Sequence, residues 1–153
     1  MLLRAAAAAA VVLVLTACGS AKKQDVAKSA LPPGCTVPEV AKTVRDFLSD
    51  PQLAPARLFE VYGSRESDRH TFLTRSRAKA LAHLRARRRL GERSRLIQLR
   101  IAEQDVNHAR IVFRLTRFAP DFRRRGIYGR LVAGAGTIDC AHQKVAAWVS
   151  KGP

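Results

Sequence analysis

Residues 91–115, "GERSRLIQLRIAEQDVNHARIVFRL", decide the fold, because the spacing of apolar residues changes here to every second position. Ile97 and Leu99 alternate with polar residues, and Ile111 and Phe113 repeat the pattern after the turn-like "EQDVNHA". Alternation with a period of two is typical of strands that bury one face. The stretch therefore predicts two antiparallel strands joined by a turn.

Two later segments continue this pattern to the end of the chain. They are "IYGRLVAGAGTID" at 127–139 and "KVAAWVS" at 144–150, and "APDFRRRG" and "CAHQ" separate them from the preceding strands. Because short turn-like separators join neighbouring antiparallel strands, the second half of the chain predicts a meander of about four strands.

The residues before Gly91 predict helices. Thr36 and Glu39 have the spacing of a capping box, and the apolar residues after them recur on one helical face as far as Ser49. That stripe consists of Val37, Val40, Ala41, Val44, Phe47 and Leu48.

Two more helices are predicted, a short one over 54–62 and a longer one from Thr74 to Gly91 with a stripe of Ala78, Leu81, Ala82 and Leu84. The polar "SRESDRH" between them is predicted to be a loop. Helices followed by strands indicate an α+β fold, with N-terminal helices packed on an antiparallel sheet.

The segments 40–62, 91–115 and 129–150 resemble the nuclear transport factor two superfamily, also called the SnoaL-like or ketosteroid-isomerase-like fold. The resemblance implies a cone-like domain over 35–153, in which a curved sheet wraps the helices around a pocket. Members use that pocket for isomerisation, dehydration, ligand binding or docking, so the fold does not select a function.

The first residues have the features of an export signal. A basic start precedes the apolar run "AAAAAAVVLVL", which is too short to span a membrane. The sequence Leu15-Thr16-Ala17-Cys18 resembles the lipobox of bacterial lipoproteins. The resemblance implies that 1–17 is a signal peptide, that Cys18 is acylated, and that 18–34 is the acylated N-terminus with a flexible tether; ordinary secretory cleavage after Ala21 is the alternative.

The cysteine count agrees with this interpretation. If Cys18 is acylated, Cys35 and Cys140 remain as an even pair in an oxidising compartment, and a disulfide between them is expected. Two buried free thiols are the alternative. The histidines show no metal-ligand spacing with either cysteine, so we predict no metal site and no cofactor.

The 153-residue chain is strongly basic, with a formal net charge of +16 carried mostly by arginine, and its 47% apolar content excludes a disordered chain. Such a surface favours anionic lipid, envelope polymer or nucleic acid, although solvated arginines are the alternative. The candidate basic face consists of Arg85, Arg87, Arg88, Arg89, Arg123, Arg124 and Arg125.

Few residues suggest catalysis. Asp105 and Asp139 are the carboxylates considered for proton transfer, and their positions in a turn and at a strand end favour structural roles. Tyr62, Tyr128 and Trp148 are predicted to line the pocket, with simple core packing as the alternative. No catalytic residue is assigned.

These observations predict a lipid-anchored protein on the extracytoplasmic face of the cell membrane, with a non-catalytic ligand-binding or structural domain. The alternatives are a small pocket enzyme of the isomerase or dehydratase type, and a binder of anionic envelope polymers or nucleic acid. The expected partners are the membrane, through the lipid, and an unidentified small ligand. The sequence leaves the oligomeric state open.

Overall fold

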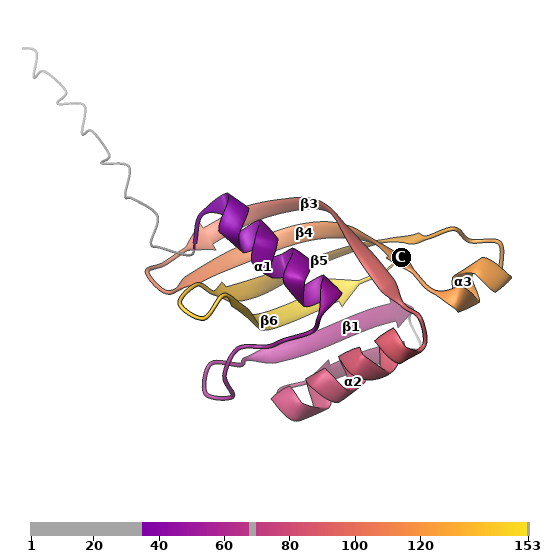
Figure 1. Cartoon of the computed structure of the whole chain (residues 1–153), viewed down its shortest axis with the longest axis horizontal. Helices are drawn as coiled ribbons and strands as arrows, with labels where there is room; N and C mark the ends of the chain where they lie inside the picture. Colours follow the sequence, from indigo (N-terminus) through magenta and orange to yellow (C-terminus); the bar gives the residue numbers. More distant parts are fainter. Residues whose placement is uncertain (1–34, 68–69, 153) are drawn as a thin grey trace, which may run out of the picture.

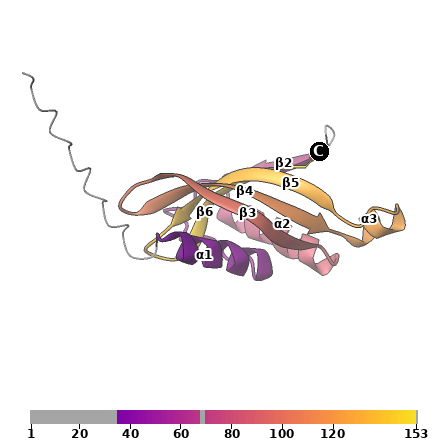
Figure 2. The same cartoon turned by 90° about the horizontal axis from the view of Figure 1, so that it is seen from above.

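The computed structural model describes residues 35–67 and 70–152, which form one curved, open sheet of six strands with two longer helices on its inner face (Figures 1 and 2). The elements are α1 (Val37–Ser49), β1 (Val61–Ser67), β2 (His70–Thr74), α2 (Arg77–Arg89), β3 (Arg93–Gln104), β4 (His108–Phe118), α3 (Pro120–Arg124), β5 (Arg130–Asp139) and β6 (Lys144–Lys151).

The first predicted helix is confirmed as α1. The Glu39 side chain accepts a hydrogen bond from the Thr36 N–H at 3.1 Å, as expected for a capping box. Val40, Val44 and Phe47 are buried against the sheet, whereas Val37, which was included in the predicted apolar stripe, is 51% exposed. Helical spacing thus identified the inner face of α1 correctly beyond its first turn.

The second predicted helix is wrong, and so is the loop predicted after it. Residues 51–60 run without regular structure beside β6, where Ala54 N–H donates to Val145 O and Glu60 N–H donates to Ala146 O, both at 2.9 Å. The chain then enters β1, which pairs parallel with β6 and antiparallel with β2. Pairing with a distant strand therefore overrides the weak helical spacing of this segment.

The third predicted helix is confirmed as α2 with a corrected start. Ser76 caps it by accepting from Lys79 N–H at 3.4 Å. Ala80 is buried, whereas Ala78 and Ala82 of the predicted stripe are exposed, and its two leucines are half-buried. The face that meets the sheet consists of Ala80, Leu81 and Leu84 and continues through the half-buried Arg87 and Arg88, so arginines occupy part of the inner stripe.

All four predicted strands are present as β3 to β6, but β1 and β2 extend the sheet to six, in the order β2-β1-β6-β5-β4-β3. An irregularity between Leu96 and Gln98 changes the phase of β3. Leu96 therefore faces inward opposite Leu115, and Ile97 is 56% exposed, contrary to the simple alternation.

Aromatic rings fill the space between the sheet and α1. The ring of Trp148 stacks on Phe113 with centroids 3.9 Å apart, and Phe47 of α1 lies 4.9 Å from the same indole. Gly134 makes this packing possible, because a Cβ there would collide with the Phe113 ring and the Val149 carbonyl oxygen. The core is thus continuous from α1 to the middle of the sheet.

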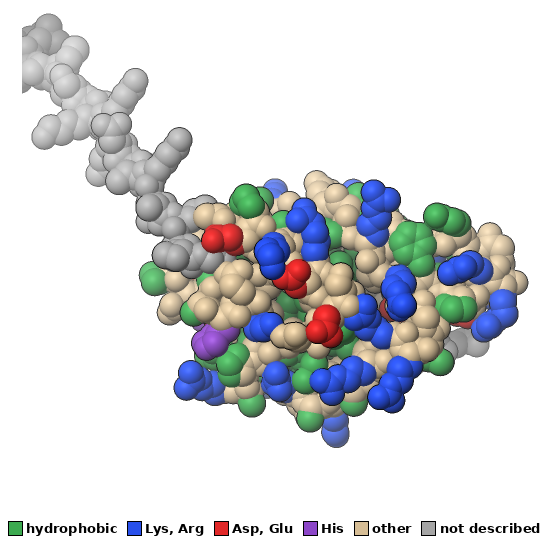
Figure 3. Space-filling model, viewed as in Figure 1, with side chains coloured by type: hydrophobic (Ala, Val, Ile, Leu, Met, Phe, Trp, Pro, Cys, Tyr) green, Lys and Arg blue, Asp and Glu red, His purple; other side chains and the backbone are tan. Residues whose placement is uncertain are grey.

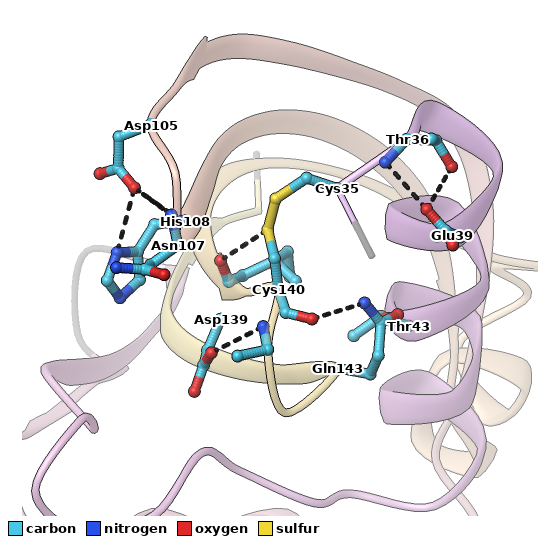
Figure 4. Close-up of a disulfide and its surroundings, with 12 residues drawn as sticks. Cys35, Thr36, Glu39, Thr43, Asp105, Asn107, His108, Asp139, Cys140 and Gln143 are labelled. Atoms are coloured by element: carbon cyan, nitrogen blue, oxygen red, sulfur yellow. Dashed lines mark hydrogen bonds and ion pairs between the residues drawn. A yellow bond between two sulfur atoms is a disulfide. The ribbon is translucent and has the colours of Figure 1, made fainter. Parts of the chain in front are cut away.

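The structure contains the expected disulfide between Cys35 and Cys140, with Cα atoms 5.2 Å apart and a sequence separation of 105 (Figure 4). Thr43 of α1 donates to Gln143, whose amide donates to the Cys140 carbonyl oxygen, both at 2.8 Å. The β5–β6 turn is therefore joined to the segment before α1 by a covalent bond and to the middle of α1 by a hydrogen-bond chain.

The predicted export signal, the predicted lipidation site Cys18 and the predicted tether lie outside the described residues. Within the ranges that the structure describes, no helix is long and apolar enough to cross a membrane.

Candidate functional site

A small pocket lies between the C-terminal ends of α1 and α2 and the inner face of the sheet. Its volume is about 70 Å³, room for a few water molecules or one compact polar group, and well below the roughly 300–1,000 Å³ of clefts that enclose drug-sized ligands. Its lining includes Phe47, Leu48, Tyr62, Leu84, Leu115, Val132 and Trp148 on the apolar side and Ser64, Arg87, Arg88, Glu92, Arg93, Arg117 and Ser150 on the polar side.

The end of α2 places Arg87 beside Glu92. Gly91 adopts a φ of +82°, Gly91 N–H donates to Arg88 O at 2.8 Å, and Glu92 N–H donates to Arg87 O at 3.1 Å. These two bonds are a Schellman cap, which turns the chain back over the last helical turn. The guanidinium of Arg87 then donates to the Glu92 carboxylate at 2.7 and 2.5 Å.

Arg117 approaches the same carboxylate from the sheet. It occupies the inward phase of β4, two residues after Leu115, and its Nε lies 3.4 Å from Glu92 Oε1. Its guanidinium also lies 5.4 Å from the centre of the Phe122 ring in α3. Burial lowers the pKa of Arg117, Glu92 opposes this effect, and Arg87 adds to it. A positive charge is therefore costly at this point.

Tyr62 supplies a neutral polar group to the pocket. It is buried, and burial raises the pKa of its phenol to about 12, although the charge of Arg87 acts in the opposite direction. The hydroxyl therefore stays protonated at physiological pH and keeps a hydrogen that it can donate. Trp148, the single tryptophan of the chain, lies opposite it in the strand register and lines the same pocket.

Of the three aromatic residues predicted to line the pocket, Tyr62 and Trp148 do so and Tyr128 does not. Tyr128 is 85% exposed and makes an edge contact with Phe118, because it lies between α3 and β5 rather than on a strand. Tyr128 falls within the strand predicted over 127–139 and was predicted on that basis to line the pocket, but β5 begins only at Arg130.

The predicted basic face is divided between the pocket and the surface. Arg87 turns inward to Glu92, its side chain only 14% exposed, and Arg88 lines the pocket half-buried. The remaining members are exposed, and Lys and Arg side chains are visible along α2 and at the end that carries α3 (Figure 3). They are Arg85, Arg89, Arg123, Arg124 and Arg125.

The carboxylates considered for proton transfer lie at turns around the disulfide (Figure 4), and neither lines the pocket. Asp105 accepts from the N–H groups of Asn107 and His108, both at 2.7 Å, and these bonds lower its pKa. Asp139 is buried beside Cys140 and lies 2.6 Å from His142 Nδ1. In the described part of the chain, no group of three His, Cys, Asp or Glu side chains could hold a metal ion.

Sequence reasoning missed Glu92 and Arg117. A signal for Arg117 was present, since the alternation of Ile111, Phe113 and Leu115 continues to residue 117 and places a charge on a buried face. Glu92 had no comparable signal, because a single acid after a helix-ending glycine is ordinary.

Comparisons with known proteins give structural likeness alone. No protein-family model and no curated protein matches the chain. Among solved structures, the chain is similar to a phenazine biosynthesis-related protein from Pseudomonas aeruginosa, with 12% identity, a TM-score of 0.42, and coverage of 74% of this chain and 78% of that one.

It is also similar to two NTF2-like proteins. One, with a cystatin-like fold, is from Novosphingobium aromaticivorans (16% identity, TM-score 0.44, covering 73% of this chain and 75% of that one). The other, of unknown function, is from Cytophaga hutchinsonii (11% identity, TM-score 0.34, covering 74% of this chain and 95% of that one).

Proposed function

We propose that the protein is an exported, lipid-anchored binding protein whose pocket holds a small ligand by an oxyanion group, a carboxylate or a phosphate. The observation that carries the proposal is the polar side of the pocket, where four arginines and one carboxylate line the same cavity. Guanidinium groups bind carboxylates and phosphates through paired N–H donors.

The arrangement of the arginines supports an anion at the mouth of the pocket, beside Arg88 and Arg93, rather than at its inner end, where Arg87 and Arg117 lie. Glu92 engages Arg87 and Arg117, so its charge is directed at the inner pair. Arg88 and Arg93 line the same pocket beside them. A bound oxyanion there would meet the guanidinium groups of Arg88 and Arg93, which suit a carboxylate or a phosphate.

The size of the pocket supports a partial rather than a complete enclosure of the ligand. About 70 Å³ accommodates a carboxylate or phosphate group, while the rest of the molecule would extend from the mouth. Tyr62 adds a protonated hydroxyl, which is a donor suited to a negatively charged oxygen.

A binding role accounts for these residues better than acid–base catalysis. A general base must accept a proton from the substrate, and Glu92, the one carboxylate among the described lining residues, already accepts from Arg87 at 2.7 and 2.5 Å. No histidine lies among those lining residues. The domain is therefore proposed to bind its ligand without transforming it.

Anchorage through Cys18 is part of the proposal and rests on the four residues Leu15 to Cys18. Two acyl chains would hold the protein at the membrane, since one chain alone binds marginally. The intact mass of membrane-extracted protein tests this directly. The wild type should carry a diacylglyceryl group on Cys18, and a Cys18→Ala variant that is processed and retained identically would contradict the anchor.

Ligand binding can be followed through Trp148, because its indole lines the pocket and the chain has no other tryptophan. We expect inorganic phosphate or acetate to change its fluorescence in a saturable manner, at constant ionic strength set with chloride. Arg88→Gln should weaken the affinity by about 10- to 150-fold, the loss of one charge-assisted hydrogen bond of about 1.5–3 kcal/mol.

Arg45→Gln is the matched control, since it removes the same charge from an exposed position on α1 that does not line the pocket. Equal weakening in both variants, or a response that only follows ionic strength, would overturn the anion site.

A further inference from the structure

The outer face of the sheet, opposite α1 and α2, carries an apolar row that crosses five strands. Register pairs Leu73 with Gly63, Gly63 with Val149, Val149 with Ala135, and Ala135 with Val112. Leu73 is 66% exposed and Val149 is 46% exposed. With neighbouring strands about 4.8 Å apart, the row is about 19 Å long. In the part of the chain that the structure describes, no element covers it.

Basic side chains border this row. Arg100 continues it on β3, opposite Val112, and the next row along the strands holds Arg114 and Lys151. All three are exposed. Among the described outward-facing strand residues, the one exposed carboxylate is Glu103, and it is already bound by Arg110 at 2.9 Å. The outer face is therefore apolar along one line and positive beside it.

A hollow of about 410 Å³ lies where the two features meet. Its lining includes Gln98, Arg100 and Arg114 as polar groups and Val112 and Ala133 as apolar ones. The irregular register of β3 between Leu96 and Gln98 and the small side chain of Ala133 make the room. Two guanidinium groups at one hollow suit a phosphate diester that carries an apolar portion.

We propose that this outer face docks on the surface of a membrane that contains anionic lipid. Arg100 and Arg114 bind lipid phosphates at the hollow, and the row from Leu73 to Val112 lies against the boundary between headgroups and acyl chains. The inference rests on the proposed anchorage, because a tethered domain always has a membrane within reach. Residues 19–34, which the sequence predicts to be the tether, extend to at most about 55 Å.

Charge complementarity favours this occupant over a second copy of the chain. Face-to-face contact between two copies would bring two sets of arginines together, whereas an anionic leaflet attracts juxtamembrane basic residues by about 1 kcal/mol each by a general estimate, or about fivefold in affinity. Docking by the outer face also leaves the inner face, which holds the pocket, directed away from the lipid.

The test uses the chain from Gly19 onward without its lipid, since that chain contains every described helix and strand. It is mixed with vesicles of phosphatidylcholine and phosphatidylglycerol, or of phosphatidylcholine alone, and the bound fraction is measured by sedimentation. We expect binding to the mixed vesicles only. The double variant Arg100→Gln with Arg114→Gln should lower the affinity by about 30-fold.

The matched control is Arg85→Gln with Arg89→Gln, which removes two exposed charges from α2, on the inner side of the sheet and outside the pocket lining. We expect its vesicle binding to stay near that of the wild type. Equal losses in the two double variants would show attraction by net charge alone and overturn the proposal, as would absence of binding to the mixed vesicles. Dimerisation that the outer-face variant abolishes, without an effect on vesicle binding, would assign the face to a second copy.

The anchor is tested separately, by the mass of the natural product. Vesicle binding by a chain that carries no lipid therefore reports on the outer face whether or not Cys18 is acylated, and the two proposals can fail independently.

Discussion

Breaking the disulfide should cost the domain a large part of its stability. Cys35 and Cys140 close a loop of 105 positions and join the first residue of the described domain to the last turn of the sheet. On the chain-entropy account, a loop of about 100 residues restricts the unfolded chain by about 4.7 kcal/mol. Domains of this size are stable by about 5–15 kcal/mol, so the loss would be from a third to nearly all of the total.

Urea denaturation of the chain from Gly19, followed by Trp148 fluorescence and circular dichroism with and without reductant, measures the difference. We expect the reduced protein, and the double variant Cys35→Ala with Cys140→Ala, to lose about 3–5 kcal/mol, with a fall in Tm of more than about 10 °C. The variant should lose slightly more, because both cysteines are buried and removal of each sulfur leaves unfilled volume.

A thiol titration of the unfolded, unreduced chain supplies the control, and it should find no free thiol. Two free thiols, or a reduced protein within about 1 kcal/mol of the oxidised one, would refute the reasoning. The second outcome would mean that the hydrogen bonds from Thr43 through Gln143 to the Cys140 carbonyl hold this end of the domain on their own.

Three further changes test the packing and the charges. Gly134→Ala should lower the free energy of unfolding in urea by about 1–3 kcal/mol, since the new Cβ meets the Phe113 ring and a main-chain oxygen. The control Ala135→Ser, at an exposed neighbouring position, should change that free energy by less than about 0.5 kcal/mol. Arg77→Met should cost roughly 2 kcal/mol, because its guanidinium donates to two loop carbonyl oxygens at 2.7 and 3.1 Å; an unchanged urea midpoint would contradict this. Burial lowers the pKa of His83 below 6.5, so the unfolded chain binds this proton at a higher pH than the folded domain does, and the stability of the domain falls as the pH drops through 6.5. His83→Phe should therefore show a smaller fall in Tm between neutral and mildly acidic pH. A fall equal to that of the wild type would refute the assignment.

The parts of the fold that local chemistry specifies could be predicted from the sequence. The capping box of Thr36 and Glu39 and the alternation around Phe113 depend on neighbours within a few positions, and α1 and the four strands β3 to β6 are present as expected. The cysteine pair was predicted from a count and a compartment, without geometry.

The parts that depend on distant contacts could not. Residues 54–62 have apolar residues at helical spacing, yet their main-chain groups pair with β6, nearly 90 positions later in the chain. The pocket illustrates the same limit, since Arg87 and Arg117 come from elements far apart in sequence and meet at a carboxylate that neither pattern identified. The one signal in the sequence was Arg117, an arginine at a strand position where the alternation predicts an apolar residue. It indicated that a charge is buried, but not which group it binds.

The topology keeps the proposed anchor and the proposed ligand site apart. Register places His108 opposite Asp139, beside the disulfide, and Arg117 opposite Arg130 at the other end of the same strand pair. The two positions on β4 are nine residue steps apart, or about 30 Å at 3.4 Å per step. The chain enters the domain at the disulfide end, so a lipid at Cys18 would hold that end while the pocket mouth stays at the far one. A ligand could then reach Arg88 and Arg93 without passing between the domain and the membrane, even with the outer face lying flat on lipid.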